Sequence, residues 1–347
     1  MRILVTGGAG FIGGNLCREL ARRPETYRVI AMDDLSTGSA DNLSGVGAEF
    51  VKASILDRPL LEEAVEASDA VIHLAAIPSV PRSLADPVRT YEVNANGTMM
   101  VLEACRRKST YLVFASSSSV YGASAISPKH EDLPARPLSP YAASKVAAEA
   151  SVLAYGAGYG LPVLVLRFFN VYGPLQRAGH PYAAVIPVFI DAALSGEPMR
   201  IHGDGQQGRD FTFVSTVVDV LADAVRRRVT SAIPVNLAYG TRVSITDLAG
   251  RIAAAVGVAP DIQYGPARVG DVPDSQADAR RLRGLFTGVQ PVSLDVGLAQ
   301  TVAWHQRSQP RMAPQGKGLA EEAVAWLQAR SVPDAAGVPT EPGLAGI

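Results

Sequence analysis

The sequence is poor in several functional groups, and each scarcity excludes a class of protein. Its 347 residues include two cysteines, Cys17 and Cys105, which are too few for a disulfide framework or a cysteine metal cluster. Both are most simply buried thiols of a reducing compartment, and we predict no metal site. The 32 basic and 33 acidic residues give a net charge of −1, so no basic excess is left for binding nucleic acid or an anionic membrane.

Long hydrophobic runs are also missing. No stretch approaches the roughly 20 apolar residues of a membrane span, and the opening MRILVTGG enters a strand pattern directly. We therefore expect a cytoplasmic protein without a membrane partner, whose ligand is a small molecule.

Short apolar runs rich in β-branched residues recur along the first half of the chain, and most are separated by segments with helical apolar spacing. The runs are RILVT, YRVIAM, AEFVKA, DAVIHLA, YLVFAS and PVLVLRFF. Strands that alternate with helices favour a parallel sheet covered on both faces. The predicted fold class is therefore α/β, a doubly wound parallel sheet of the Rossmann type with a smaller mixed α/β domain.

The pattern changes along the chain and predicts two interleaved domains. We expect a dinucleotide-binding domain over residues 1–169, with a returning segment at about 211–238, and a substrate domain over 170–210 and 239–310. Residues 311–347 should contain one helix, GLAEEAVAWLQAR, and a poorly ordered tail rich in Pro, Gly and Ala.

The first predicted strand runs into the glycine-rich stretch TGGAGFIGGN. Gly7, Gly10 and Gly13 are spaced three apart, which suits a tight turn where backbone amides and a helix N-terminus approach a pyrophosphate. The second strand ends about 20 residues later at Asp33, where a carboxylate can accept hydrogen bonds from a ribose diol. Because this acid would repel a 2′-phosphate, the pattern favours NAD over NADP.

Four consecutive serines, Ser116 to Ser119, follow the strand that begins at Tyr111. Further on, Tyr141 and Lys145 are four residues apart at the start of a predicted helix, so both project from one face. For Tyr141 to act as a base near pH 7, its phenolate needs about 4 kcal/mol of stabilisation. An ammonium about 4 Å away supplies roughly that amount, and a nicotinamide cation adds to it.

Together these residues resemble the extended short-chain dehydrogenases/reductases, and within them the nucleotide-sugar 4-epimerases. The resemblance covers about residues 1–308 and rests on TGGAGFIG, DDLSTG, HLAA, SSSSVYG, YAASK, RFFNVYGP and GDGQQGRDF. It implies an NAD-dependent isomerase that acts on a UDP-sugar, with Ser117, Tyr141 and Lys145 as catalytic residues. The cofactor-binding residues that it implies are Gly7, Gly10, Phe11, Ile12, Gly13, Asp33, Asn94 and Lys145. The substrate-binding residues are Ser79, Ser118, Asn170, Arg209, Arg268, Asp271 and Ser275.

The serine cluster also bears on the type of reaction. Related sugar 4,6-dehydratases carry Asp and Glu at the two positions after the catalytic hydroxyl, where this chain has Ser118 and Ser119. Hydroxyls cannot easily replace carboxylates in proton transfer, so the pattern favours epimerisation at C4 through a transient 4-keto sugar. One departure from the family concerns the adenine, where Ser54 stands in place of the usual Asp.

Ser275 bears on the sugar. It resembles a position that holds Tyr in epimerases restricted to glucose and galactose, and a small residue in those that accept N-acetylated sugars. We therefore expect UDP-GlcNAc and UDP-GalNAc as well as UDP-Glc and UDP-Gal. A UDP-glucuronate 4-epimerase, a nucleotide-sugar 4-ketoreductase and a non-catalytic NAD-binding regulatory module stay open as alternatives. The physiological sugar, the direction of reaction and the base of the nucleotide also stay open.

By the same resemblance, two helical segments, RTYEVNANGTMMVLEACRR and YAASKVAAEASVLAYG, are predicted to form a homodimer contact.

Overall fold

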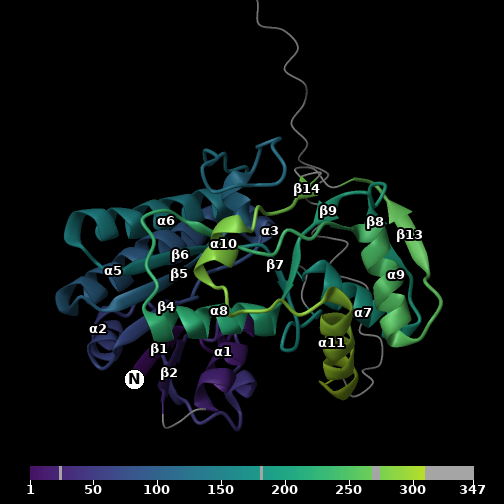
Figure 1. Ribbon diagram of the computed structural model, residues 1–347. Coiled ribbons are helices and arrows are strands. Elements are labelled where there is room, and N and C mark those ends of the chain that lie inside the picture. The colour runs from purple at the N-terminus through teal and green to yellow at the C-terminus, as the bar shows by residue number, and fades with distance from the viewer. Residues whose placement is uncertain (23–25, 180–182, 268–273, 309–347) are drawn as a thin grey trace, which may run out of the picture. The chain divides into compact units, whose positions relative to one another are not determined.

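In the computed structural model of the protein, a seven-stranded sheet lies at the centre of the fold (Figure 1). The structure describes residues 1–22, 26–179, 183–267 and 274–308. All pairings in the sheet are parallel, and the strands follow the order β11-β6-β5-β4-β1-β2-β3. The strands are β1 (Arg2–Thr6), β2 (Arg28–Asp33), β3 (Glu49–Lys52), β4 (Ala70–His73), β5 (Tyr111–Ser117), β6 (Val163–Phe168) and β11 (Val235–Leu237). The predicted fold class is confirmed, and each of the six apolar runs contains one of these strands, except that β2 and β5 extend one residue beyond their runs.

Helices cover both faces of the sheet because side chains alternate along each strand. Ile3 and Val5 of β1 pack in one core with α1 (Phe11–Ala21) and α8 (Val214–Arg227). Leu4 faces the other core, which α2, α5 and α6 close. The helices on that side are α2 (Arg58–Glu66), α3 (Val80–Ala85), α4 (Pro87–Tyr91), α5 (Gly97–Lys108) and α6 (Pro140–Tyr159). Cys17 and Cys105 are buried free thiols, one in each core.

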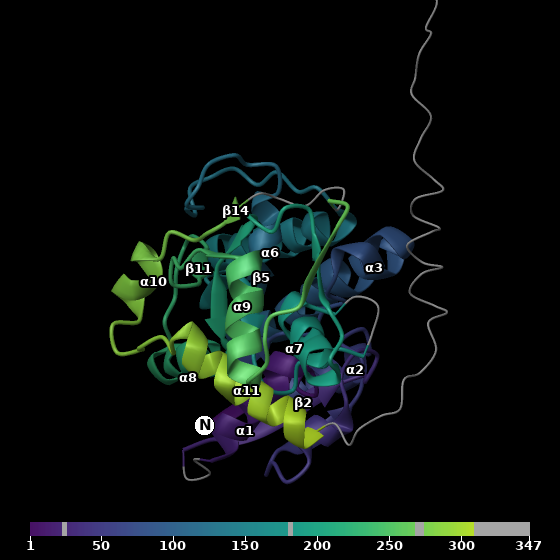
Figure 2. The same ribbon diagram turned by 90° about the vertical axis from the view of Figure 1, so that its right-hand side faces the viewer.

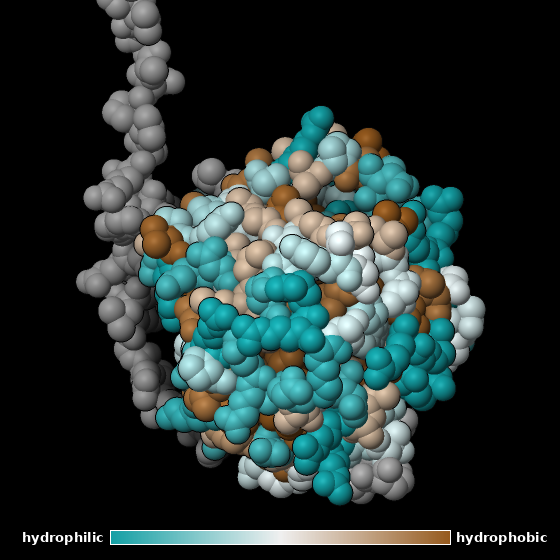
Figure 3. All heavy atoms as spheres, turned by 90° about the vertical axis from the view of Figure 1, so that its left-hand side faces the viewer, coloured by the Kyte–Doolittle hydropathy of each residue, from teal (hydrophilic) through white to brown (hydrophobic). Residues whose placement is uncertain are grey.

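One predicted helix differs in detail from the expectation. The segment that begins near Arg89 forms α4, a π-helical stretch η2 (Glu92–Asn96) and α5. Short 3-10 turns, η1 (Ala40–Leu43) and η3 (Ser118–Tyr121), follow β2 and β5. The face beside α2 and α5 is mostly hydrophilic, with hydrophobic side chains in small separate spots (Figure 3).

Smaller elements gather beside the carboxyl ends of the sheet strands, and Figure 2 views them from the side of α7, α9 and α11. Three small sheets, β10-β7, β12-β9-β14 and β13-β8, lie in this part of the chain. The strands are β7 (Asn170–Tyr172), β8 (Met199–His202), β9 (Gly208–Arg209), β10 (Phe211–Phe213), β12 (Val243–Ser244), β13 (Ile262–Gly265) and β14 (Asp274–Ser275). The helices are α7 (Val185–Ser195), α9 (Ile245–Val256), α10 (Arg280–Leu285) and α11 (Leu294–Ser308).

Residues 1–308 form one compact unit. Within it the segment 211–238 returns to the main sheet, where β11 pairs with β6. The division into a cofactor domain and a substrate domain stays a prediction. The helix expected within residues 311–347 lies outside the described residues. Within the described ranges, no helix combines the length and apolar character that crossing a bilayer requires.

Candidate active site

The glycine-rich loop connects β1 to α1 at the carboxyl edge of the sheet. Gly7 has φ +70°, and a Cβ there would lie 2.8 Å from the backbone nitrogen of Ala75. A Cβ on Gly13 would clash with the carbonyl oxygen of Gly7. The loop amides of Gly7 and Gly8 donate to the carbonyl of Met32 at 2.8 and 3.2 Å. Side chains are therefore excluded where the chain turns back on itself, which leaves backbone and the start of α1 to face a ligand.

Asp33 ends β2 beside this loop and is 8% exposed. Its carboxylate accepts hydrogen bonds from the backbone nitrogens of Ala9 (3.0 Å) and Leu35 (2.8 Å), which fix its orientation. Burial raises the pKa of Asp33, while these backbone donors act in the opposite direction. The carboxylate is thus held in place at the edge where a ribose would bind.

A cleft of about 350 Å³ opens at this edge, along the carboxyl ends of the strands. Its lining contains nine of the predicted cofactor and catalytic residues: Gly7, Gly10, Phe11, Ile12, Gly13, Asp33, Ser117, Tyr141 and Lys145. Ser54 also lines the cleft; it is the residue that stands where the family usually has an Asp for the adenine.

Several other residues line the cleft although the sequence did not predict them, among them Asp34, Thr37, Phe168, Phe169 and Gln176. The first two follow Asp33 closely and the others belong to or follow the quoted stretch RFFNVYGP. Position after a strand end was therefore the signal that could have found them.

Asn94 supports the wall of the cleft without lining it. Its amide accepts from the backbone nitrogen of Ile77 (2.8 Å) and donates to the Ile77 carbonyl (3.1 Å) and to the hydroxyl of Ser144 (3.0 Å). This side chain ties the loop after β4 to α6. The contacts fit a supporting position next to the cofactor-binding loop.

The first two turns of α6 place Tyr141 and Lys145 in the cleft. Ser139 caps the helix by accepting from the backbone nitrogen of Ala142 at 3.1 Å, and Pro140 occupies the first turn. The Lys145 ammonium donates to the carbonyl of Ala115 at 2.9 Å and lies 5.1 Å from the ring centroid of Phe114. Two residues four apart thus point into one cleft from one helical face.

Burial dominates the electrostatics of this pair. It lowers the pKa of Lys145 to about 8, while Glu149 acts to raise it. It also raises the pKa of Tyr141, and a hydrogen bond with Ser117 opposes that shift. The net shift of the Tyr141 pKa is upward, opposite to the lowering expected from Lys145, because loss of hydration dominates. Tyr141 is therefore a neutral phenol at pH 7.

The four serines have different partners. Ser117 hydrogen bonds with Tyr141, and its hydroxyl oxygen accepts from the backbone nitrogen of Ser119 at 3.2 Å. The Ser119 hydroxyl donates to the same oxygen at 2.9 Å. Ser116 donates to the Glu149 carboxylate at 2.6 Å, and Ser118 begins η3. The cluster is thus a set of positioned groups around one strand end.

Three predicted substrate residues converge on Asp210. Arg209 and Ser275 are register partners in the parallel pairing of β9 with β14, and the backbone nitrogen of Asp210 donates to the Ser275 carbonyl at 3.0 Å. The Asn170 amide donates to the carbonyl of Asp210 at 3.2 Å. Ser79 caps the start of α3, has φ +94°, and its side chain accepts a hydrogen bond from the backbone nitrogen of Arg82. The structure thus brings Asn170, Arg209 and Ser275 together. Arg268 and Asp271 lie outside the described residues.

Comparison with known families decides the membership of the chain. The model of the "NAD dependent epimerase/dehydratase family" matches residues 3–238. The chain belongs to this family. NAD is accordingly its cofactor, and the tight glycine turn from Gly7 to Gly13, with the oriented Asp33, fits a dinucleotide in the cleft.

Individual relatives match almost along their whole lengths. The chain is 40% identical to a UDP-glucose 4-epimerase of Mycolicibacterium smegmatis over 309 residues, covering 87% of this chain and 97% of that protein. A UDP-N-acetylglucosamine 4-epimerase from Methanobrevibacter ruminantium M1, solved with UDP-N-acetylmuramic acid, superposes with a TM-score of 0.84 at 34% identity. That match covers 89% of this chain and 99% of the other.

A UDP-glucuronic acid 4-epimerase from Bacillus cereus, solved with UDP-glucuronic acid and NAD, is a further structural neighbour. It has a TM-score of 0.81 at 30% identity, over 89% of this chain and 100% of the other. The three proteins share a name for the reaction and differ in the named sugar.

Proposed function

We propose that the protein is a UDP-sugar 4-epimerase that inverts C4 through a transient 4-keto sugar. The observation that carries the proposal is the shared cleft: Tyr141, Lys145 and Ser117 line it together with the glycine-rich loop and Asp33. Proton-transfer groups and the cofactor-binding loop thus meet in one place. The names of the similar proteins, all three 4-epimerases of UDP-sugars, support the same reaction.

In this proposal each residue has a separate task. The glycine-rich loop and Asp33 would hold NAD, which would supply the acceptance of a hydride from C4 and its return to the opposite face of the sugar. Tyr141 takes the proton of the 4-hydroxyl, which Ser117 holds by a hydrogen bond. The Lys145 ammonium stabilises the Tyr141 phenolate, whose formation burial otherwise opposes. Arg209 binds the diphosphate with its planar fork of donors, as we also propose for Arg268, while Asp271 meets the nucleoside ribose.

The residues beside Ser117 support epimerisation over dehydration. Ser118 and Ser119 stand where a dehydratase would carry its acid and base, and the Ser119 hydroxyl is directed to Ser117. A hydroxyl has too high a pKa to remove or supply a proton as a carboxyl group does. Elimination of water across C5 and C6 therefore lacks its acid and base at these two positions.

For the sugar we propose the N-acetylated pair, UDP-GlcNAc and UDP-GalNAc, together with UDP-Glc and UDP-Gal. Ser275 is a small, partly exposed residue on β14 next to Arg209, which leaves room for an acetamido group. UDP-glucuronate is the second candidate, because a glucuronate epimerase is among the structural neighbours. Asn170 disfavours it, since the resemblance implies Thr at that position in glucuronate epimerases.

The test is incubation with a panel of UDP-sugars without added cofactor, with products identified by NMR. Interconversion of the C4 epimers is expected, with NAD released only on denaturation. No turnover of any UDP-sugar would contradict the proposal. Turnover that needs exchangeable NADPH would identify a ketoreductase instead, and bound NAD without turnover would favour a regulatory module.

We further propose a homodimer through α4, α5 and α6. Three large hydrophobic side chains of α4 and α5 are exposed: Val88 (79%), Tyr91 (45%) and Met99 (37%). A second copy would cover them by helix packing. Light scattering at micromolar protein should give twice the chain mass, and a monomer mass would reject the dimer.

A further inference from the structure

A buried carboxylate lies one helical turn beyond Lys145. Tyr141, Lys145 and Glu149 follow one another at intervals of four on α6, so they share one face of the helix. Glu149 is 6% exposed and Lys145 is 4% exposed. Glu149 does not line the cleft, and the reaction proposed above gives it no task.

Glu149 connects three elements. Its Oε2 atom accepts from the Ser116 hydroxyl of β5 at 2.6 Å and from Nε of Arg167 on β6 at 3.1 Å. Its Oε1 atom accepts from Nη2 of Arg167 at 2.6 Å, which completes a two-point ion pair. Ser116 and Arg167 are register partners in the main sheet. The carboxylate therefore pins α6 to the ends of two adjacent strands.

Ser116 stands between two groups of the reaction centre. The carbonyl of Ala115, just before it, accepts the ammonium of Lys145 at 2.9 Å, and Ser117, just after it, hydrogen bonds with Tyr141. A movement of Ser116 would displace both neighbours because the three residues are consecutive in one strand. Glu149 thus holds the strand segment on which the geometry of Lys145 and Ser117 depends.

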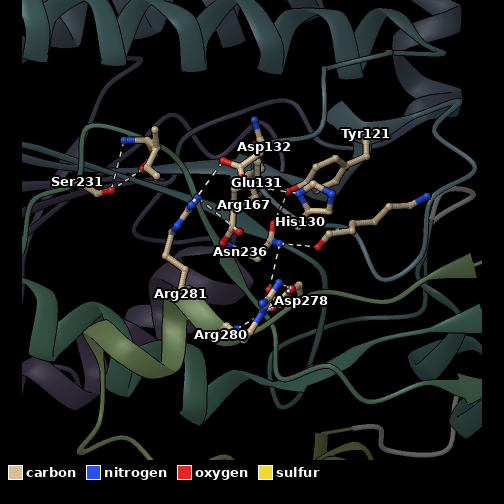
Figure 4. A network of polar contacts seen from close by, with 12 residues as sticks. Tyr121, His130, Glu131, Asp132, Arg167, Ser231, Asn236, Asp278, Arg280 and Arg281 are labelled. Atoms are coloured by element: carbon tan, nitrogen blue, oxygen red, sulfur yellow. Dashed lines mark hydrogen bonds and ion pairs between the residues drawn. The ribbon is translucent and has the colours of Figure 1, made fainter.

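Arg167 is itself held from the far side. Its guanidinium lies 4.7 Å from the ring centroid of Tyr121, and the Tyr121 hydroxyl donates to Oδ1 of Asn236 at 2.6 Å. The backbone nitrogen of Asn236 donates to Oε1 of Glu131 at 2.9 Å, and Figure 4 shows these side chains converging in one network. Arg167 also donates to the Glu131 carbonyl at 3.4 Å. Arg167 is therefore fixed by Tyr121 and Glu131 as well as by Glu149, and it would not shift together with the Glu149 side chain.

A buried ion pair adds little stability over apolar residues of similar volume. Packing alone therefore does not account for a charge at this place. We infer that Glu149 is a positioning residue of the reaction centre, whose carboxylate keeps Lys145 protonated and fixes the segment from Ala115 to Ser117. The inference depends on the proposed function in one respect, namely that Lys145 takes part in the reaction.

The other charged and titratable groups near Lys145 do not supply this effect. His73 of β4 hydrogen bonds with Thr6 and Thr98, and burial lowers its pKa to about 3, so it is neutral near pH 7. Tyr141 is neutral before the reaction because burial raises its pKa. Arg167 is a cation and is neutralised by Glu149 itself. Loss of the Glu149 charge would therefore remove the anion that favours the Lys145 ammonium and leave the Arg167 cation uncompensated.

The test follows the Lys145 Cε resonance in protein labelled with [13C]lysine, assigned through Lys145→Met, as the pH is raised. In the parent the midpoint should be near 8. Glu149→Gln removes the charge and keeps the shape, and should lower the midpoint by about one unit or more. The alkaline limb of kcat should move to lower pH by a similar amount, since Lys145 loses its proton earlier.

A second variant covers the case in which Glu149→Gln does not fold. Glu149→Met combined with Arg167→Met replaces the pair by apolar side chains, which the fold is expected to tolerate. Its Lys145 midpoint should fall in the same direction by a smaller amount. Glu103→Gln is the matched control, because Glu103 on α5 also pairs with an arginine, Arg106, but at the surface. It should leave both the midpoint and the limb unchanged.

A midpoint that moves by less than about a third of a unit in every folded Glu149 variant would overturn the inference. The resonance of Lys145 reports independently of turnover. If the parent epimerises no sugar but the midpoint falls, the proposed function fails while the effect of Glu149 on Lys145 holds. If the parent epimerises and the midpoint stays, only the role of Glu149 fails.

Discussion

The two sides of the cleft are built differently. On the cofactor side, β1, β2, β4 and β5 are four to seven residues long and lie inside a parallel sheet with buried faces. On the substrate side, β9, β12 and β14 are two residues long, and Arg209 and Ser275 lie in the small three-stranded sheet that they form. The proposed catalytic residues thus lie on elements that the core fixes, whereas the proposed specificity residues depend on a few local hydrogen bonds.

This difference explains how sugar specificity could change without loss of the reaction. Asp210, which is fully buried, holds the substrate side together. It accepts from the backbone nitrogens of Gly240 (2.9 Å) and Ala277 (3.1 Å) and from the hydroxyl of Thr241 (3.1 Å). One carboxylate therefore fixes the loop after β11 and the end of β14. Replacements around it leave the main sheet untouched, in line with the shared fold of neighbours that act on different named sugars.

The largest effect is expected on the cofactor side, from Tyr141→Phe. Removal of the proton-accepting hydroxyl should reduce kcat by about 10³-fold or more, while NAD content stays near that of the parent because the ring still fills its place. Tyr159→Phe is the matched control, since Tyr159 ends the same helix, is 63% exposed and should be silent. Epimerisation by Tyr141→Phe within about tenfold of the parent would remove Tyr141 from the mechanism.

Gly13→Ala should disrupt the glycine-rich turn on the cofactor side of the cleft. The added methyl group would clash with the carbonyl oxygen of Gly7, so the loop must shift away from the dinucleotide. We expect about 10- to 100-fold weaker NAD binding and a loss of about 1 to 3 kcal/mol in the free energy of unfolding. Calorimetry on the apoprotein measures both quantities.

Gly158→Ala provides the comparison for this variant. A Cβ at Gly158 meets nothing within 4 Å, and its helical position should gain up to about 1 kcal/mol. Equal NAD affinity in Gly13→Ala and Gly158→Ala would show that the tight turn is not what the cofactor requires.

The same contrast explains what the sequence could predict. The strands, the glycine-rich loop and the pair of Tyr141 and Lys145 follow from local spacing, because periodicity and turn chemistry determine them. The links between Glu149 and Arg167, and between Asp210 and Ala277, join residues far apart in the chain, so no local pattern indicates them. The upward shift of the Tyr141 pKa could not be predicted from the sequence either, because burial depends on the whole fold.

Ser275→Tyr tests the substrate side at its weakest element. A Tyr on β14 beside Arg209 would occupy the volume that we assign to the acetamido group, at a cost of about 1 to 3 kcal/mol for the larger sugar. The ratio of kcat/KM for UDP-GlcNAc to that for UDP-Glc should therefore fall by about 5- to 150-fold. An unchanged ratio would remove Ser275 from specificity, and a parent that turns over no acetylated sugar would remove the proposed substrate.

The smallest effect on turnover, and a specific effect on stability, is expected from Asp210→Asn. Burial raises the pKa of Asp210 to about 6, against 3.8 for an ordinary Asp. The folded state thus holds this proton more tightly than the unfolded state, so the contribution of Asp210 to stability is complete at low pH and is lost as pH rises through about 6. Between pH 4 and 7 the free energy of unfolding of the parent should therefore fall, relative to that of Asp210→Asn, by about 2 to 3 kcal/mol. Chemical denaturation of both proteins across this range measures the difference, in which the titration of all other groups cancels.

Asp223→Asn is the control, because Arg227 and Arg226 lower the pKa of Asp223 and place its titration below this pH range. A flat difference for Asp210→Asn, like that expected for Asp223→Asn, would mean that the three donors around Asp210 outweigh its burial and that the substrate side is held by a fully ionised carboxylate.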